Sequence, residues 1–160
     1  MTLKEMTAEQ PVETISGTNF TCSQFGKFSQ LTDFWIQHPR MQRKAQGKVF
    51  LKDYLNLTGM QVSLNKLPAG RAVPFAHRHR ENEELYIFIG GKGQMQIDGE
   101  IIEITEGTCI RVSPNGSRTW RNNSSEDLYY VVVQAKDHSL SIDTFDDGLP
   151  DENPVVWPTP

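Results

Sequence analysis

Between residues 48 and 142, apolar and polar residues alternate in short runs that glycine, proline and asparagine separate. Alternation with a period of two turns successive side chains to opposite faces of a strand, so each run predicts a half-buried β-strand. Clear examples are residues 60–65, 85–89 and 128–133. The only helical turn expected among them is at residues 52–57. The pattern predicts an all-β fold, a sandwich or a barrel.

Two of these runs carry further information. Residues 93–104 read GQMQIDGEIIEI, and Asp98-Gly99 supplies the two positive-φ residues of a tight type I′ turn, which predicts a β-hairpin. In the run at residues 60–65, apolar positions 60, 62 and 64 alternate with polar ones. That strand is therefore predicted to have one apolar and one polar face.

The two ends of the chain differ from this central region. We predict an irregular N-terminal extension over residues 1–47 whose aromatic side chains pack on the barrel, the barrel itself over 48–142, and an acidic, proline-rich C-terminal arm over 143–160. The last stretch combines five acidic residues with four prolines, which argues against a central strand or a helix. It is either a disordered tail or an extended arm, and VVW at 155–157 favours an arm that docks, for instance on a second subunit.

Composition narrows the classes of partner. With 160 residues the chain is most simply one domain, and a formal net charge of −4 argues against a nucleic-acid partner. The one basic cluster, Arg40, Arg43, Lys44 and Lys48, is interpreted as a solvated face rather than a phosphate-binding tract. Small molecules or a second copy of the chain are the expected partners.

The sequence also favours a cytoplasmic protein without a membrane partner. The N-terminus has no apolar signal region, and no window approaches the roughly 18 apolar residues that a membrane span requires. Cys22 and Cys109 form no CxxC pair, and in a reducing compartment we expect both to be buried free thiols.

Candidate metal ligands lie in the segment AHRHRENEELYIFIGG, residues 76–91. On an extended backbone, His77 and His79 leave the same side of the chain, and Glu84 follows five positions later. Imidazole and carboxylate together suit zinc, iron, nickel, copper or manganese. The segment taken alone is equally consistent with a charged, solvated loop before a strand.

In the order of its parts, this region resembles the cupin superfamily. The first cupin motif, a glycine, HxH, a glutamate and a second glycine, falls on Gly70, His77, His79, Glu84 and Gly91, with one extra residue after the first glycine. Glu83 followed by Gly90 is a rival for the acidic position. We prefer Glu84 because it shares a strand face with Tyr86 and Phe88. The resemblance spans about residues 48–135 and implies a double-stranded β-helix, the jelly-roll barrel of cupins.

The second cupin motif departs from the family. Aligned without a gap, it falls on Gly107, Ser113, Asn115, Arg118 and Asn122, so Arg118 stands where the family has its third metal-binding histidine. A register shifted by one puts Thr119 at that position, needs an insertion, and also lacks the histidine. We favour the gapless register because it keeps Trp120 on the face of Arg118. The other two histidines, His38 and His138, are interpreted as surface residues.

The resemblance implies a site for a divalent transition metal (Fe, Mn, Ni or Zn) formed by His77, His79 and Glu84. An arginine beside a divalent ion in a dry pocket is unfavourable, and two arrangements would satisfy the charges. In one, the three ligands hold a metal while Arg118 binds the carboxylate or phosphate of a substrate. In the other, Arg118 pairs with Glu84 and the histidines line a pocket without metal.

Tyr86 and Trp120 share strand faces with these residues and are candidate substrate-binding aromatics, although packing in the barrel core is their more ordinary role. Two functions of different classes follow. The first is a pocket that binds a divalent metal and a small anionic, carboxylate-like molecule, as in a metal-dependent enzyme. The alternative is a metal-free, non-catalytic module that binds a sugar or a carboxylate. A purely structural role in an assembly is a third, and analogy with single-domain cupins implies a homodimer. The sequence names no substrate or reaction and does not decide whether the protein is an enzyme.

Overall fold

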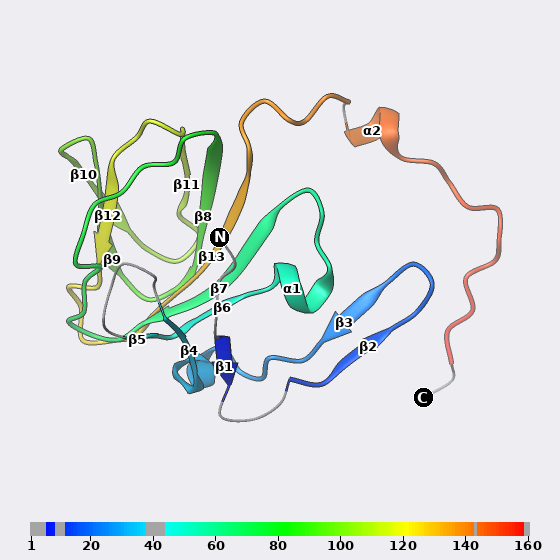
Figure 1. Ribbon diagram of the computed structural model, residues 1–160, viewed down its shortest axis with the longest axis horizontal. Helices are drawn as coiled ribbons and strands as arrows, with labels where there is room; N and C mark the ends of the chain where they lie inside the picture. The colour runs from blue at the N-terminus through cyan, green and yellow to red at the C-terminus, as the bar shows by residue number, and fades with distance from the viewer. Residues whose placement is uncertain (1–5, 9–11, 38–43, 143, 159–160) are drawn as a thin grey trace.

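The computed structural model describes residues 6–8, 12–37, 44–142 and 144–158, and its body consists of two facing antiparallel sheets (Figure 1). The larger has the order β11-β8-β13-β7-β6 and the smaller the order β10-β9-β12. Their bounds are β6 Lys48–Phe50, β7 Gln61–Leu67, β8 Asn82–Gly90, β9 Gly93–Ile97, β10 Glu100–Ile104, β11 Cys109–Val112, β12 Arg118–Arg121 and β13 Leu128–Lys136. This is the predicted all-β, double-stranded β-helix architecture, although the described strands do not join into a closed barrel.

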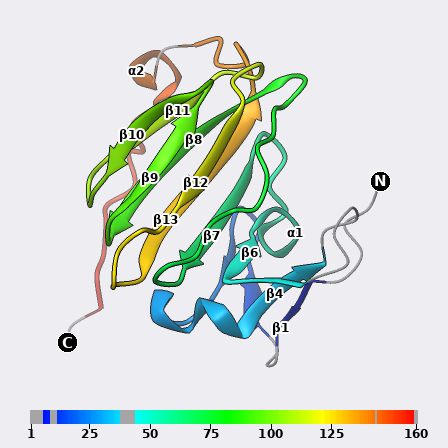
Figure 2. The same ribbon diagram turned by 90° about the vertical axis from the view of Figure 1, so that its left-hand side faces the viewer.

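The predicted β9–β10 hairpin is confirmed. Asp98 and Gly99 have φ values of 51° and 95°, as a type I′ turn requires, and Ile97 pairs with Glu100 across it. Figure 2 shows this hairpin beside β12 on the side of the molecule that faces the viewer. Side chains from both sheets meet in one core cluster that includes Phe88, Met95 and Trp120. Burial of this apolar surface is what holds the two sheets together.

The segment between β7 and β8 extends the smaller sheet. Backbone hydrogen bonds join His77 to Arg118 in both directions, and the amide of Val73 donates to the carbonyl of Trp120. The histidines therefore lie on an irregular extended segment along the edge of β12, before β8 begins at Asn82. This pairing brings the two motif regions together.

Strand β7 has the predicted alternation, but its inner face is the polar one. Ser63 and Asn65 are 2% and 1% exposed, whereas Val62 and Leu64 on the other face are only half-buried. The apolar outer face is still shielded from solvent, since the 3₁₀ helix η1 (Phe28–Asp33) packs against this strand. Polar side chains thus line part of the interior.

The N-terminal region contains the short strands β1 Met6–Ala8, β2 Thr14–Ser16, β3 Thr21–Ser23, β4 Phe34–Gln37 and β5 Lys44–Gln46. Ring contacts link it to the body: Phe25 meets Tyr54 on the one-turn helix α1 (Lys52–Leu55), and Phe28 meets Tyr129 on β13. Helix α1 confirms the helical turn predicted at residues 52–57. Arg40 and Arg43 of the basic cluster, like His38, lie outside the described residues.

The C-terminal region projects away from the sheets (Figure 1). Contrary to the sequence prediction, it begins with a one-turn helix, α2 (Thr144–Asp147), which ends before the first proline of the region and carries Asp146 and Asp147 in its first turn, where acidic groups favour a helix. Its apolar side chains, such as Trp157 at 83%, are largely exposed. None of the described helices is long and apolar enough to cross a membrane. Cys22 and Cys109 are free as predicted, but both are exposed because they occupy outward positions of their strands.

Candidate metal and anion site

The two histidines point to the same side of their segment, as the sequence predicts. Their ring centroids are 5.5 Å apart, and both side chains stay about one quarter exposed, so this edge of the interior opens to solvent. One ring nitrogen of each histidine and one carboxylate oxygen of Glu84 lie within 4.8 Å of one another. This spacing makes His77, His79 and Glu84 a group that fits around one metal ion.

The two oxygens of Glu84 have different partners. Oε2 accepts hydrogen bonds from Nη2 and Nε of Arg118, at 2.6 and 3.1 Å, and from the hydroxyl of Tyr86 at 2.6 Å. Oε1 lies 3.1 Å from Nε2 of His79. Nε2 of His77 lies 4.0 Å from Oε2. Arg118 thus fixes the carboxylate through Oε2 and leaves Oε1 turned to His79.

These contacts shift the pKa values of the site. Burial alone would raise the pKa of Glu84, but hydrogen bonds from His79, Tyr86 and Arg118 and the arginine charge outweigh it and lower the pKa to about 2. Burial and the charge of Arg118 lower the pKa of His77 to about 4. His77 is therefore neutral at physiological pH, which is the form that binds metals. Its Nδ1 atom is buried and has no hydrogen-bond partner among the residues that the structure describes.

Gln134 on β13 orients the second histidine, and sequence reasoning missed it. Its side-chain nitrogen lies 3.0 Å from Nδ1 and 3.2 Å from Nε2 of His79, while Gln134 pairs with Glu84 across the two strands. Donation of the amide to Nδ1 would place the ring proton on Nε2, facing Glu84, whereas donation to Nε2 would place it on Nδ1. Turning the amide over would let its oxygen accept a proton from Nδ1 and free Nε2 for a metal.

Comparison with known proteins agrees with this architecture. Residues 63–134 match the Cupin domain family. A cupin protein of known structure from Bacteroides fragilis is 39% identical, the alignment covers 73% of this chain and 97% of the relative, and the TM-score is 0.64. The chain belongs to the cupin superfamily.

Two other cupin-like structures share the fold at lower identity. One, described as a predicted oxalate decarboxylase from Thermotoga maritima, is 21% identical over 69% of this chain and 96% of its own, with a TM-score of 0.54. The other, a sugar phosphate isomerase of the cupin superfamily from Silicibacter pomeroyi, is 20% identical over 56% and 60%, with a TM-score of 0.51. The search among functionally curated proteins found no match.

The structure supports the gapless register of the second cupin motif. Arg118 faces inward against Glu84, whereas Thr119, the alternative, faces outward and donates to the carbonyl of Val73. The preference for Glu84 over Glu83 is supported in the same way, because Glu83 pairs with Arg111 instead. Arg118, which stands where the cupin motif has its third histidine, is therefore the ion-pair partner of Glu84.

The residues predicted to bind substrate are all deeply placed. Arg118 is 0% exposed, and its Nη1 donates to the carbonyl of Gly116, so its guanidinium is engaged by protein groups. Tyr86 and Trp120 are 1% and 7% exposed, and the indole of Trp120 donates to the hydroxyl of Tyr130. Their contact with a substrate stays a prediction.

Lys48 corrects another expectation. Instead of lying on a solvated basic face, it is half-buried, and burial lowers its pKa to about 8 while Glu84 partly opposes that shift. The signal in the sequence was the alternation KVF at 48–50, which places Lys48 and Phe50 on one strand face.

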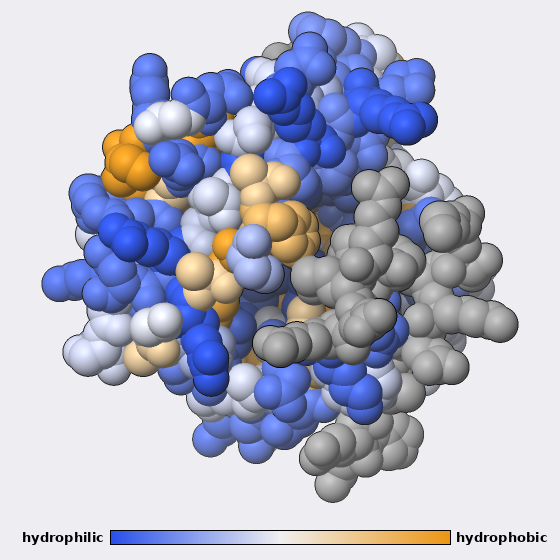
Figure 3. All heavy atoms as spheres, turned by 60° about the vertical axis from the view of Figure 1, so that its left-hand side comes forward, coloured by the Kyte–Doolittle hydropathy of each residue, from blue (hydrophilic) through white to orange (hydrophobic). Residues whose placement is uncertain are grey.

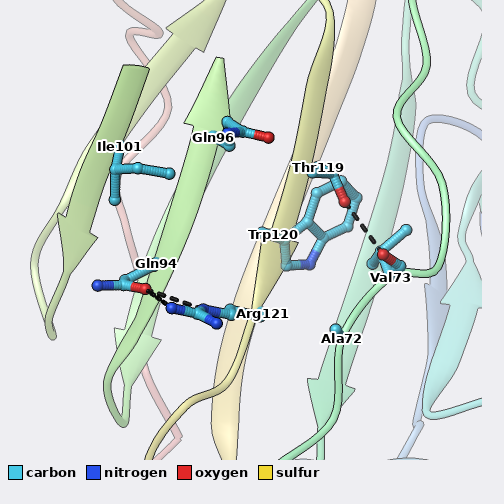
Figure 4. A pocket seen from close by; sticks show the side chains of 8 residues that line it. All are labelled: Ala72, Val73, Gln94, Gln96, Ile101, Thr119, Trp120 and Arg121. Carbon is cyan, nitrogen blue, oxygen red and sulfur yellow. Dashed lines mark hydrogen bonds between the residues drawn. The ribbon is translucent and has the colours of Figure 1, made fainter. Parts of the chain in front are cut away.

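A separate pocket of about 300 Å³ lies on the outer face of the smaller sheet (Figure 4). Figure 3 shows this side as mostly hydrophilic, with a group of apolar residues near its centre. The pocket lining has no histidine or acidic side chain: it comprises Ala72, Val73, Gln94, Gln96, Ile101, Thr119, Trp120 and Arg121. The candidate metal ligands are not part of it.

Proposed function

We propose that this cupin binds a divalent transition metal through Nε2 of His77, Nε2 of His79 and Oε1 of Glu84, and a small anionic molecule beside it. Iron, manganese, nickel and zinc suit this set of ligands. A bound metal would supply Lewis-acid polarisation and orient the anion. The chain's own residues position the ligands, keep His77 neutral and exclude water from the floor of the site.

One observation carries this proposal, the division of the Glu84 carboxylate. Arg118 and Tyr86 take Oε2, which lies 4.0 Å from Nε2 of His77, so the arginine does not compete for Oε1, the oxygen that faces His79. The ion pair also neutralises the arginine charge, which weakens the repulsion expected between Arg118 and a divalent ion. The two arrangements that the sequence left open therefore combine: Arg118 pairs with Glu84, and a ligand set remains.

A second candidate is a metal-free binding module. It is favoured by the 3.1 Å separation of His79 Nε2 and Glu84 Oε1, because a hydrogen bond there satisfies the remaining oxygen without a metal. In that case the histidines act as hydrogen-bonding groups for a sugar or a carboxylate.

Elemental analysis of protein purified without added metal or chelator tests the proposal. We expect about one equivalent of metal per chain in the wild type and in His138→Ala, a control at a histidine that is 90% exposed. The His77→Ala/His79→Ala variant should lose the metal and keep its circular dichroism spectrum. Metal retained by the double variant would refute the ligand assignment, and a metal-free wild type would favour the second candidate.

The cytoplasmic location and the homodimer remain proposals that rest on the sequence and on the resemblance to single-domain cupins.

A further inference from the structure

The inner face of the larger sheet carries a cation beyond the metal-ligand group. Lys48 pairs with Asn65, which pairs with Tyr130, which in turn pairs with Phe88. Directly opposed residues of antiparallel strands share a face, so Lys48 lies on the face that also carries Glu84. Its Nζ is 4.7 Å from the ring centroid of Phe50, so the side chain extends along β6.

No described residue offers Lys48 a carboxylate within ion-pair distance. The acid whose charge acts on it, Glu84, is already held by Arg118, Tyr86 and His79. Near Glu84, the described residues of the two inner faces therefore provide two cations, Lys48 on the larger sheet and Arg118 on the smaller, against this one anion. A half-buried charge without a partner is unfavourable, and an anionic ligand would relieve it.

Next to Lys48, a buried hydrogen-bond acceptor has no donor. The side-chain nitrogen of Asn65 donates to the carbonyls of Ser63 and Tyr130, which fixes the orientation of the amide. Its Oδ1 is buried and makes no hydrogen bond in the described residues. Such an atom costs free energy unless a ligand hydroxyl, or a water that the ligand orders, supplies a donor.

We propose that Lys48 and Asn65 form an anion-binding and hydroxyl-binding subsite inside this cupin, which selects a small hydroxylated anion such as a sugar acid or a sugar phosphate. Lys48 contacts the anionic oxygens, and Asn65 Oδ1 receives a hydroxyl group. This inference rests on the proposed function, because it names the class of anion that binds beside the metal ligands.

Isothermal titration calorimetry with defined probes tests the subsite. D-Gluconate and ribose 5-phosphate supply hydroxyls with a carboxylate or a phosphate, hexanoate supplies a carboxylate without hydroxyls, and sorbitol supplies hydroxyls without charge. The wild type should bind at least one of the two hydroxylated anions about tenfold or more tightly than hexanoate or sorbitol, and the better of the two identifies the anionic group.

Lys48→Met should weaken binding of the preferred anion by about tenfold to a hundredfold, the range for losing a charge-assisted hydrogen bond. The control Lys92→Met, at an exposed lysine on the β8–β9 turn, should bind like the wild type. Unchanged affinity in Lys48→Met, equal affinity for gluconate and hexanoate, or no binding of either hydroxylated anion would overturn the inference.

Metal content measured on the same samples separates this inference from the proposed function. If the protein contains metal but its affinity for the anion does not depend on Lys48, the subsite alone is rejected. If the protein contains no metal but its affinity for the anion depends on Lys48, the metal assignment alone is rejected.

Discussion

Arg118 and Lys48 are cations on the inner faces of opposite sheets, and their surroundings differ. Arg118 is fully buried, donates two hydrogen bonds to Glu84 and one to the carbonyl of Gly116, and so belongs to the scaffold of the site. Lys48 stays half-buried, and its described contact is with the Phe50 ring. The motif predicted that Arg118 binds the ligand. Under our proposal this role falls to Lys48, which lies outside both motifs and has no carboxylate partner among the described residues.

Removing the arginine should have the largest effect. Arg118→Met leaves the Glu84 carboxylate buried without its strongest partner, which we expect to lower the free energy of unfolding by about 3–5 kcal/mol. Lys48→Met should change it by less than about 1 kcal/mol. Urea unfolding at neutral pH measures both. If the two substitutions cost the same, the distinction between a structural and an available cation fails; adding Glu84→Leu to Arg118→Met should restore part of the loss.

Acid unfolding of the metal-free protein should show the same ion pair. Since the folded-state pKa of Glu84 is about 2, below its usual 4.5, its stabilising effect is present above pH 4.5 and is lost as pH falls toward 2. The loss should be on the order of 3 kcal/mol. Comparing urea midpoints of wild type and Glu84→Gln between pH 6 and 2.5 isolates this carboxyl, and parallel curves would contradict the assigned role.

Gln134 should affect metal affinity more than stability. Gln134→Leu removes the group that can accept the Nδ1 proton of His79, so metal affinity should fall by roughly tenfold to a hundredfold. Competition with a chromophoric chelator measures it. Gln96→Leu, at an exposed position on the outer face of β9, is the matched control. Equal affinity in the two variants would exclude an orienting role for Gln134.

The smallest expected effect is a change in stability at alkaline pH, caused by the deprotonation of Lys48. Its pKa in the folded protein is about 8, below 10.5, so the unfolded chain binds more protons between these values and stability rises with pH. Because Lys48 is partly exposed, solvent screening should keep the gain to about 1 kcal/mol or less. The difference in urea midpoint between wild type and Lys48→Met should therefore move in favour of the wild type from pH 7.5 to 10. A constant difference would show that Lys48 is fully solvated.

The strands could be predicted because local alternation and turn chemistry agree with the fold. Asp98-Gly99 alone was enough to locate a hairpin, since few other pairs tolerate two positive φ values. The inner face of β7 could not be predicted in this way. Alternation shows that one face is apolar but not which face turns inward. Here η1 packs against the strand, a contact between distant parts of the chain, and Ser63 and Asn65 are the residues that turn inward.

At the site, spacing was enough to group His77, His79 and Glu84 and to place Arg118 opposite them. Spacing says nothing about which oxygen of a carboxylate meets which neighbour. It also did not reveal Gln134 or Lys48, because both reach the site through strand pairing rather than through a motif.

The division of the Glu84 carboxylate can be observed directly in a crystal structure of the protein as purified, with anomalous diffraction data collected at the absorption edge of the metal that elemental analysis identifies. We predict an anomalous peak at about 2.0–2.2 Å from Nε2 of His77, Nε2 of His79 and Oε1 of Glu84, with Arg118 still on Oε2. A crystal without such a peak, or a metal bound to Oε2 with the arginine displaced, would contradict this prediction.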